Sequence, residues 1–383
     1  MTMKIEIIGA GAVGLLHGAR LALGGAQVRM LTRGKEQAEL LARDGIRLSR
    51  GGEAVDVAVE ASALQDAAMA EAEASTLQDA ETAEVEASAL QDAETAEVAS
   101  FALQDAETAE VASSALQDAA TAEVEASAQH DAASATAEAG PNGREGRWHV
   151  LAVKQSALGP ELLRQLAALL RPGDSLLCLQ NGIGHLERLA RTLPGIRLYA
   201  GVTSEGALRV GAREVVHAGA GELHYGPALG ADGSASADPL LAGWRQALQR
   251  AGIAAFLSND VEDRIYRKLL LNAVINPLTA LLDVPNGRLP EHPQGIRLMK
   301  ALHEESLSIL VSAGFAATGE EWERLLDVCR RTAANTSSML ADVRAGRPTE
   351  IASINGELAR LAARHGVPAP LNEAAAALVH ALE

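Results

Sequence analysis

The sequence predicts an α/β protein, with a doubly wound parallel sheet in its first two thirds and an all-α part after it. Two observations support this class. Strand-like and helix-like segments alternate from the N-terminus to about residue 258, which is typical of a parallel sheet covered by helices on both faces. From about Asp260 onward the text is almost entirely helical. We therefore expect one domain over residues 1–258 and a second over residues 259–383.

The individual elements follow in chain order. "MKIEIIGAG" reads as a buried strand that enters a glycine-rich turn, and "VGLLHGARLALGG" reads as the helix after it. "AQVRMLTR" is a second strand, and "GIRLSR" with "AVDVAVEA" forms a short hairpin. Further on, "RWHVLAVK" is a strand, "SALGPELLRQLAALL" a helix, and "DSLLCLQNG" a strand that ends in Asn-Gly.

An acidic repeat interrupts this pattern between residues 62 and 142. The segment holds 18 of the 50 acidic residues and none of the 33 basic ones, so it supplies the whole net charge of −17. "LQDA" recurs every 13 residues, with Leu at positions 64, 77, 90, 103 and 116 and Gln129 in the next equivalent place. A 13-residue period sustains neither a coiled-coil seam nor one face of a strand.

Three interpretations of the repeat remain open. Its Ala, Glu, Gln, Asp, Ser and Thr content favours a disordered or transiently helical insertion that the fold does not require. The alternatives are an ordered repeat module that binds a partner and a stack of helix-turn-helix units. Nothing in the segment supplies chemistry.

Composition excludes several classes of protein. Two cysteines, Cys178 and Cys329, cannot form a disulfide framework, which favours a reducing compartment. No metal-ligand spacing is present, and no basic patch with interleaved aromatics suggests nucleic acid. Glu6, His17 and Arg20 interrupt the apolar N-terminus, which argues against a signal peptide. With no long uncharged apolar run, we expect a cytoplasmic protein that does not enter a membrane.

The glycine-rich turn "GAGAVG" has the G-x-G-x-x-G spacing of dinucleotide-binding folds, with Gly9, Gly11 and Gly14 at the three positions. Alone the motif is weak, because any α/β protein can have a glycine-rich turn. The strand before it and the helix after it strengthen the prediction. Gly9 would allow the tight turn, Gly11 the approach of a pyrophosphate, and Gly14 close packing of helix on strand.

The end of the second predicted strand indicates which cofactor fits. An NAD site expects an acid there for the ribose hydroxyls, but the sequence has Thr32, Arg33 and Lys35. Cations at this place suit a 2′-phosphate, so NADPH is favoured over NADH. The alternative is an ordinary solvated basic loop.

A polar stripe crosses the most apolar predicted helix. Lys268, Asn272 and Asn276 recur every four residues in "RKLLLNAVINPLTALLDVPNG", so they share one helix face. Beside a reduced nicotinamide, a lysine can donate a proton to the oxygen of a ketone that receives hydride. The asparagines can orient hydroxyl and carbonyl groups. The alternative is a surface helix with scattered polar residues.

These segments resemble one family. "GAGAVG", "LAVK", "QNGIG", "KLLLNAVINPLTALLDVPNG" and "TSSMLADVRAGRPTEIASINGELARLA" are similar to the ketopantoate reductases (2-dehydropantoate 2-reductases) over nearly the whole chain outside 62–142. The resemblance implies a Rossmann domain followed by a helical domain like that of 6-phosphogluconate dehydrogenase. It implies NADPH-dependent reduction of 2-dehydropantoate to (R)-pantoate, in pantothenate and coenzyme A biosynthesis.

The resemblance also implies roles for individual residues. Lys268 would be the proton donor, and Glu350 would lie beside it and the nicotinamide end of the cofactor. The substrate would contact Asn181, Asn272, Asn276, Asn286 and Ser338. The cofactor would contact Gly9, Ala10, Gly11, Ala12, Val13, Gly14, Arg33, Lys154, Asn181, Ala207 and Glu350. No metal is expected.

Two rival functions remain. One is reduction of another branched 2-oxo acid on the same scaffold, and the other is a non-catalytic NADPH-binding protein that recruits partners through its repeat. Lys268, Ser338 and Glu350 together argue against lost catalysis. The sequence leaves open which way Glu205 points near the cofactor loop, and a homodimer is compatible with it but not determined by it.

Overall fold

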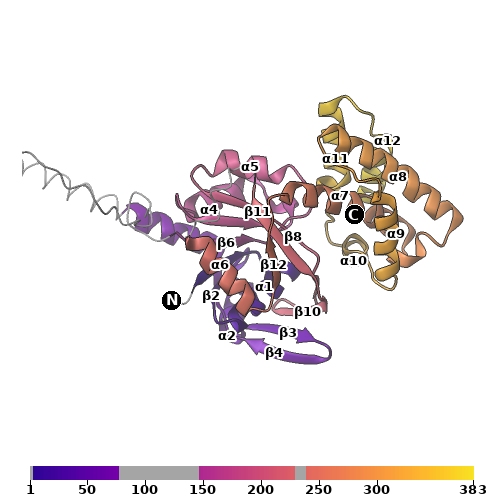
Figure 1. The fold of residues 1–383 in the computed structure, drawn as a ribbon. Coiled ribbons are helices and arrows are strands. Elements are labelled where there is room, and N and C mark those ends of the chain that lie inside the picture. The colour runs from indigo at the N-terminus through magenta and orange to yellow at the C-terminus, as the bar shows by residue number, and fades with distance from the viewer. Residues whose placement is uncertain (1–2, 77–145, 229–238) are drawn as a thin grey trace, which may run out of the picture. The chain divides into compact units, whose positions relative to one another are not determined.

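The computed structural model describes residues 3–76, 146–228 and 239–383 (Figure 1). Residues 1–68 and 139–383 form one compact unit, and residues 69–138 form a second. All elements named below lie in the first unit. The predicted order of an α/β part followed by an all-α part is confirmed.

The larger sheet has eight strands in the order β12-β11-β8-β7-β6-β1-β2-β5. Their bounds are β1 Lys4–Ile8, β2 Gln27–Thr32, β5 Glu60–Ala63, β6 Trp148–Leu151, β7 Ser175–Cys178, β8 Arg197–Thr203, β11 Glu222–Pro227 and β12 Ala254–Leu257. Neighbouring strands are parallel except β8 and β11, which are antiparallel. The parallel core places the carboxyl ends of β1, β6, β7 and β8 along one edge, where ligands of open α/β sheets bind.

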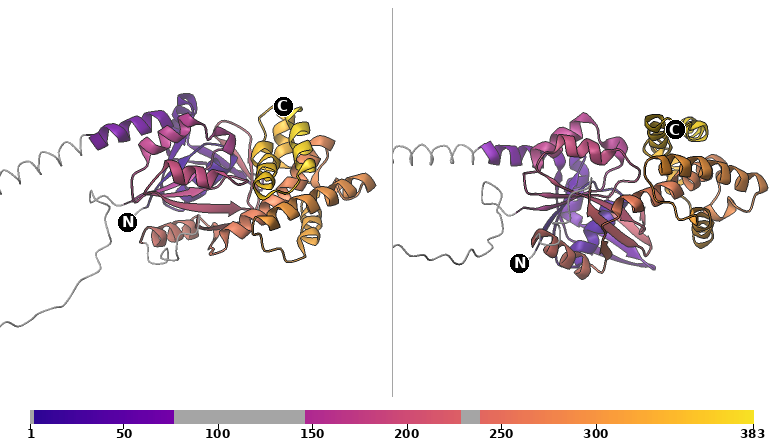
Figure 2. Two further views of the ribbon diagram at one scale, coloured as in Figure 1. Left: turned by 90° about the horizontal axis from the view of Figure 1, so that it is seen from above. Right: turned by 45° about the horizontal axis from the view of Figure 1, so that its top comes forward.

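Helices cover both faces of this sheet, as Figures 1 and 2 show. They are α1 Ala12–Leu23, α2 Lys35–Asp44, α4 Pro160–Leu169, α5 His185–Thr192 and α6 Pro239–Arg250, with a 3₁₀ turn, η1, at Gln155–Ala157. Aliphatic side chains of α1 and α6 form one core with the sheet, and those of α4 and α5 form another. Trp148 on β6 and Trp244 on α6 stack in the first core with ring centroids 4.8 Å apart.

A second, smaller sheet has the order β4-β3-β10-β9. Its strands are β3 Ile46–Arg50, β4 Glu53–Val57, β9 Gly206–Arg209 and β10 Glu214–Gly219. The predicted hairpin is the antiparallel pair of β3 and β4. The sequence did not reveal β9 and β10, which are short and add to that hairpin from far along the chain.

The acidic segment begins later than predicted. Ser62 and Ala63 belong to β5, which pairs with β2. Leu64, in the first "LQDA" copy, is 5% exposed and lies in the core with Ala67 and Ala68. The expected insertion over 62–142 is therefore wrong at its start, because this copy buries its apolar side chains. Residues 77–142 lie outside the described part of the chain.

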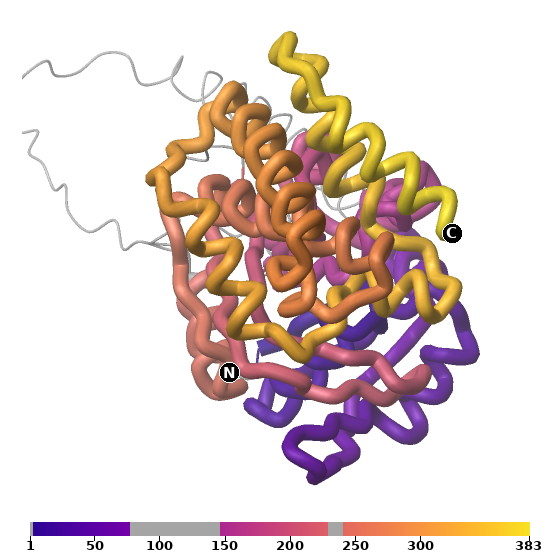
Figure 3. The backbone as a smooth tube through the Cα atoms, turned by 90° about the vertical axis from the view of Figure 1, so that its right-hand side faces the viewer, coloured from indigo at the N-terminus to yellow at the C-terminus, as the bar shows by residue number. Residues whose placement is uncertain are grey.

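The C-terminal part consists of helices gathered around α7, Val261–Leu282 (Figure 3). The others are α8 Pro293–Ser312, α9 Glu321–Arg331, α10 Ser338–Arg344, α11 Asn355–His365 and α12 Pro370–His380, with 3₁₀ turns η3 at Asn286–Arg288 and η4 at Ile351–Ser353. None of the helices in the described residues combines the length and the apolar character that crossing a bilayer requires.

A proline inside α7 leaves one backbone carbonyl without its helical partner. Pro277 has no N–H to donate to the carbonyl oxygen of Ala273, four residues earlier. The side-chain amide of Asn355, on α11, donates to that oxygen at 2.9 Å instead. Asn355 and Ala273 are fully buried, so this bond joins α7 to α11 inside the core.

Candidate active site

The glycine-rich turn between β1 and α1 has the backbone shape that a dinucleotide requires. Gly9 has φ +108°, and a Cβ there would lie 2.7 Å from Val153 Cγ1. A Cβ on Gly14 would lie 1.9 Å from the carbonyl oxygen of Gly9. A Cβ on Gly11 would meet only the Ala152 carbonyl oxygen, at 3.9 Å, so space is open at the start of α1. This turn, with Ala10, Ala12 and Val13, fits a pyrophosphate at a helix N-terminus.

The end of β2 presents an exposed cation beside this turn. Thr32 is buried and its hydroxyl donates to the carbonyl oxygen of Gly34 at 2.7 Å. Arg33 is exposed, and within the described residues its guanidinium has no hydrogen-bond or ion-pair partner. Lys35 pairs with Asp66 at 3.2 Å, and both side chains are largely exposed. Arg33 is therefore available to an anionic ligand.

Lys268 on α7 lies against the carboxyl end of β8. Its ammonium donates a 2.7 Å hydrogen bond to the carbonyl oxygen of Thr203, the last residue of β8. Burial lowers the pKa of Lys268 to about 8, and the charge of Glu350 opposes that shift. A lysine with this pKa is protonated at neutral pH and can also release its proton, as a general acid must.

Glu350, just before η4, faces the same place from the helical part. Burial raises the pKa of its carboxyl group, against a hydrogen bond from Asn181 and the charges of Lys154 and Lys268. Asn181 follows β7, and its side-chain amide donates to Glu350 at 2.8 Å. This bond joins two residues that are 169 positions apart in the chain. Lys268 and Glu350 lie close enough for their charges to interact.

Lys154, which follows β6, also contacts the helical part. Its ammonium donates to Asp342 at 2.7 Å and to the carbonyl oxygen of Pro348 at 2.6 Å. Arg347 also donates to Asp342, at 3.0 Å. The bond to Pro348 fixes the backbone at a position two residues before Glu350. A role of Lys154 at the cofactor would therefore compete with its pairing to Asp342.

The polar stripe of α7 is partly covered by protein. Asn276 is 7% exposed, and Asn272 is partly buried. Neither side chain makes a hydrogen bond within the described part of the chain, so both amides can serve a ligand. The apolar residues between them, from Ala273 to Ile275, are buried, so α7 is not the solvated surface helix of the alternative reading.

Asn286 and Ser338 are not linked to Lys268 by hydrogen bonds among the described residues. Asn286 is buried, and its amide donates to Thr332 at 3.0 Å while its side-chain oxygen has no partner in this part of the chain. Ser338 is exposed at the first turn of α10, where the neighbouring Ser337 is the N-cap and accepts from the Leu340 N–H. A substrate role for either residue stays a prediction.

Ala207 and Glu205 lie at the start of the second sheet. Ala207, on β9, is partly buried against the core that contains α1. The carboxylate of Glu205 points to α1, where it is bonded to Arg20. The sequence left the direction of the Glu205 side chain open; in the structure it points toward α1, the helix that follows the glycine-rich turn.

Two further groups beside Lys268 were not predicted from the sequence. Thr203 contributes a backbone oxygen, which no side-chain pattern reveals. Gln180 is 8% exposed and neither of its side-chain polar atoms has a partner in the described chain. A cavity of about 10 Å³ lies here, lined by Gln180, Asn181, Gly182, Gly201, Val202, Ile265, Lys268 and Leu269. Gln180 directly precedes the predicted site residue Asn181 in the sequence, and this position was the one signal that could have indicated it.

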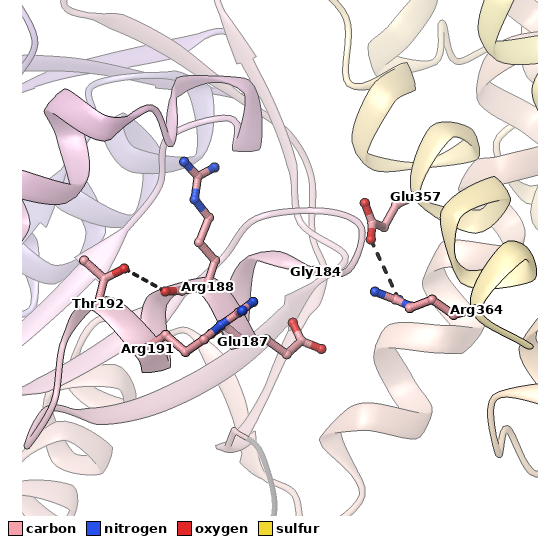
Figure 4. Close-up of a pocket in the computed structure, with 7 residues that line it drawn as sticks. All are labelled: Gly184, Glu187, Arg188, Arg191, Thr192, Glu357 and Arg364. Atoms are coloured by element: carbon pink, nitrogen blue, oxygen red, sulfur yellow. Dashed lines mark hydrogen bonds and ion pairs between the residues drawn. The ribbon is translucent and has the colours of Figure 1, made fainter.

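A larger pocket of about 600 Å³ is lined by residues of α5 and α11 and of the turn before α5, as Figure 4 shows. Its lining is Gly184, Glu187, Arg188, Arg191, Thr192, Glu357 and Arg364. Arg191 donates to the carbonyl oxygen of Glu187, and Glu357 pairs with Arg360 and Arg364. This pocket shares no lining residue with the cavity beside Lys268.

Among the described residues, no cluster of His, Cys, Asp and Glu has the geometry of a metal site.

Comparison with known proteins gives consistent matches. The family model described as "Ketopantoate reductase PanE/ApbA" matches residues 5–97 and 87–230, and "Ketopantoate reductase PanE/ApbA C terminal" matches residues 260–383. A 2-dehydropantoate 2-reductase of Halobacterium salinarum is 33% identical over 54% of this chain and 67% of its own length. One of Shigella flexneri is 36% identical over 55% and 66%. The chain thus spans about two thirds of the length of these relatives.

Solved structures share the fold. A PanE/ApbA family ketopantoate reductase from Ralstonia eutropha superposes with a TM-score of 0.71 at 21% identity, covering 99% of this chain and 98% of its own. D-mandelate dehydrogenase in complex with NADH and anilino(oxo)acetate has a TM-score of 0.71 at 22% identity, with the same coverage. At this identity the likeness concerns the fold alone. The family-model matches cover both parts of the chain, and the chain therefore belongs to the ketopantoate reductase family.

Proposed function

We propose that this protein is an NADPH-dependent 2-dehydropantoate 2-reductase, with Lys268 as the proton donor. The observation that carries the proposal is the position of the Lys268 ammonium. It is bonded to the Thr203 carbonyl oxygen at the carboxyl end of β8, and its charge interacts with that of Glu350, which accepts from Asn181. This is the edge of a parallel sheet at which dinucleotide-binding folds place their ligands.

The residues present fit NADPH. The Gly9–Gly14 turn leaves room for a pyrophosphate at the start of α1, and Arg33 is free to pair with a 2′-phosphate. When bound, this cofactor supplies the hydride. Lys154, Asn181, Ala207 and Glu350 are proposed to complete the cofactor site, with Lys154 exchanging its bond to Asp342 for one to the ligand.

Lys268 is proposed to give its proton to the ketone oxygen of the substrate. One N–H of the ammonium stays on the Thr203 carbonyl, which fixes the direction of the other two. Glu350 favours the charged form of the lysine and, through Asn181, ties the two parts of the chain together. A positioned acid of this kind contributes about 10²–10⁴-fold to the rate.

The asparagines of α7 are proposed to select the substrate. Asn272 and Asn276 lie on the face of Lys268 and have no other side-chain partner among the described residues. Ketopantoate carries a hydroxyl and a ketone that two neutral amides can orient without adding charge. Ser338, with Asn181 and Asn286, is proposed to complete the substrate site. In this proposal, residues 1–258 supply most cofactor contacts, and residues 259–383 supply the acid, most substrate contacts and Glu350.

A second candidate is the reduction of another branched 2-oxo acid. The shared fold of D-mandelate dehydrogenase, crystallised with NADH and anilino(oxo)acetate, favours keeping it. The third candidate, a non-catalytic NADPH-binding protein that recruits partners through its repeat, predicts cofactor binding without turnover. A homodimer and a cytoplasmic location remain predictions.

The test is NADPH oxidation by the purified protein with ketopantoate and with a panel of other 2-oxo acids. We expect the highest kcat/KM for ketopantoate. A higher kcat/KM for another acid would support the second candidate, and binding of NADPH without oxidation by any acid would support the third.

A further inference from the structure

A buried acid outside the predicted site lies between the cofactor helix and the catalytic lysine. The side chain of Glu205, in the turn between β8 and β9, is 3% exposed. Arg20, on α1, donates to it. His17, also on α1, and His217, on β10, each place a ring nitrogen 3.7 Å from this carboxylate. Side chains from two elements, α1 and β10, thus meet at this one acid.

The negative charge of Glu205 is balanced by the positive charge of Arg20. Burial lowers the pKa of His17 to about 4 and also lowers the pKa of His217, so both rings are neutral at neutral pH. Arg20 is then the one cation that contacts Glu205 among the described residues. A buried carboxylate without a partner is strongly unfavourable, so the pair fixes the position of the Glu205 side chain.

The backbone of the same turn leads directly to Lys268. The N–H of Glu205 donates to the Thr203 hydroxyl at 3.2 Å, and the Thr203 carbonyl accepts from the Lys268 ammonium at 2.7 Å. Gly221, in the turn between β10 and β11, packs closely against this turn. A Cβ on Gly221 would lie 2.4 Å from the carbonyl carbon of Ser204 and 2.5 Å from the nitrogen of Glu205.

We propose that Glu205 is a positioning residue for Lys268: its bond to Arg20 fixes the turn whose Thr203 carbonyl holds the lysine ammonium. This inference rests on the proposed reductase function for its catalytic meaning. It extends the site by one residue that touches neither cofactor nor substrate. It also connects the helix that begins at the glycine-rich turn to the proton donor.

The alternative is that the Arg20–Glu205 pair only fastens the second sheet to α1. Both readings predict a loss of stability when Glu205 is replaced, so stability cannot separate them. The two interpretations predict different pKa values for Lys268 in the variants. The Thr203 carbonyl stabilises the charged form of Lys268, so a displaced carbonyl lowers the pKa of the ammonium. A merely structural pair leaves that pKa unchanged.

The primary experiment measures the pKa of Lys268 directly, by NMR titration of protein labelled with ¹³C in the lysine side chains. The chain has only five lysines, and the signal is assigned with Lys268→Ala. Glu205→Ala should lower this pKa by roughly one unit, the effect of losing a hydrogen bond to a charged group. Glu205→Gln, which keeps an acceptor for Arg20, should give a smaller shift. Glu350, Arg20, His17 and His217 are unchanged in both variants.

The second readout is the pH dependence of kcat. Since the ammonium is the acid, activity falls as the pH rises through the pKa of Lys268, and Glu205→Ala should move this fall to lower pH. Its kcat should be within about twofold of the parent near pH 6 and roughly tenfold lower near pH 8.5. The control Glu222→Gln removes an exposed acid from β11 and should change neither readout.

The outcomes separate the two proposals. An unchanged Lys268 pKa in folded Glu205→Gln and Glu205→Ala protein would overturn the positioning role, whether or not the protein is a reductase. If Glu205→Ala does not fold, a Lys268 pKa in Glu205→Gln equal to that of the parent overturns it. A shifted pKa in a protein that oxidises no NADPH with any 2-oxo acid would keep the positioning role and overturn the proposed function.

Discussion

The ammonium of Lys154 donates a 2.7 Å hydrogen bond to the carboxylate of Asp342, a residue 188 positions away in the chain. The bond joins the end of β6, at the proposed cofactor site, to α10 in the helical part. Because the same ammonium is proposed to contact NADPH, Asp342 and the cofactor compete for it.

This competition predicts that replacing Lys154 and replacing Asp342 change the affinity for NADPH in opposite directions. Lys154→Ala should weaken NADPH binding, whereas Asp342→Asn should strengthen it roughly two- to fivefold, in line with the small energies of partly exposed ion pairs. The dissociation constant is measured by fluorescence titration without substrate. Asp283→Asn, which breaks the exposed pair with Arg344, is the control and should have no effect. Weaker binding in both Lys154→Ala and Asp342→Asn would mean that the bond is structural.

Arg33 should determine the preference for NADPH over NADH. The side chain is exposed after β2 and has no partner among the described residues, so it can pair with a 2′-phosphate. Arg33→Asp should reduce kcat/KM for NADPH by roughly 10- to 100-fold, as expected for a hydrogen bond to a charged group, and change that for NADH little. Lys35→Ala, two residues away, should have a smaller effect. Equal kcat/KM for both cofactors in the unmodified protein would refute the assignment.

The hydrogen bond from Asn355 to Ala273 should stabilise the helical part because Pro277 leaves that carbonyl free. Asn355→Ala should lower the free energy of unfolding by about 1–3 kcal/mol, the range for a buried polar group left without a partner. Pro277→Ala restores an N–H that can donate to the same oxygen. The double variant should therefore lose less stability than the two single changes added together. The free energies of unfolding are measured by denaturant titration. If the losses of the two single variants add up to that of the double variant, the side chain of Asn355 and the restored N–H do not compete for the Ala273 carbonyl.

The acidic segment should be dispensable only beyond its first copy. Deleting residues 77–142 and joining the ends with a short Gly/Ser linker leaves residues 64–76 and 143–147 to connect β5 to β6. Parallel strands need a crossover of about a dozen residues or more, so the fold and the reductase activity should persist. Loop closure changes by only about 0.6 kcal/mol per doubling of length.

Deletion of residues 62–142 is the matched contrast. It removes Leu64, Ala67 and Ala68 from the core and leaves too short a crossover, so we expect it not to fold. Thermal melting and ketopantoate-dependent NADPH oxidation compare the two deletions. A loss of folding in the shorter deletion would show that the repeat is an integral part of the enzyme.

The sequence predicted those features that side-chain patterns carry. Alternating strand-like and helix-like segments predicted the parallel sheet, and the glycine spacing predicted the turn at Gly9. A lysine and two amides four residues apart marked the partly buried polar face of α7. What it missed depends on backbone atoms and distant partners. The Thr203 and Ala273 carbonyls have no side-chain signature, and the pairing of Glu205 with Arg20 spans 185 positions. The start of the insertion was misplaced because the first repeat copy reads like the others although Leu64 is buried.

The most direct test of the central claim is the pH dependence of kcat for the unmodified protein and for Lys268→Ala, with NADPH and ketopantoate at saturation. In the unmodified protein, kcat should fall as the pH rises through about 8, because the ammonium that donates the proton is lost there. Lys268→Ala should bind NADPH normally, turn over about 10²–10⁴-fold more slowly, and lack this fall. Near-normal turnover of Lys268→Ala at neutral pH would contradict the account.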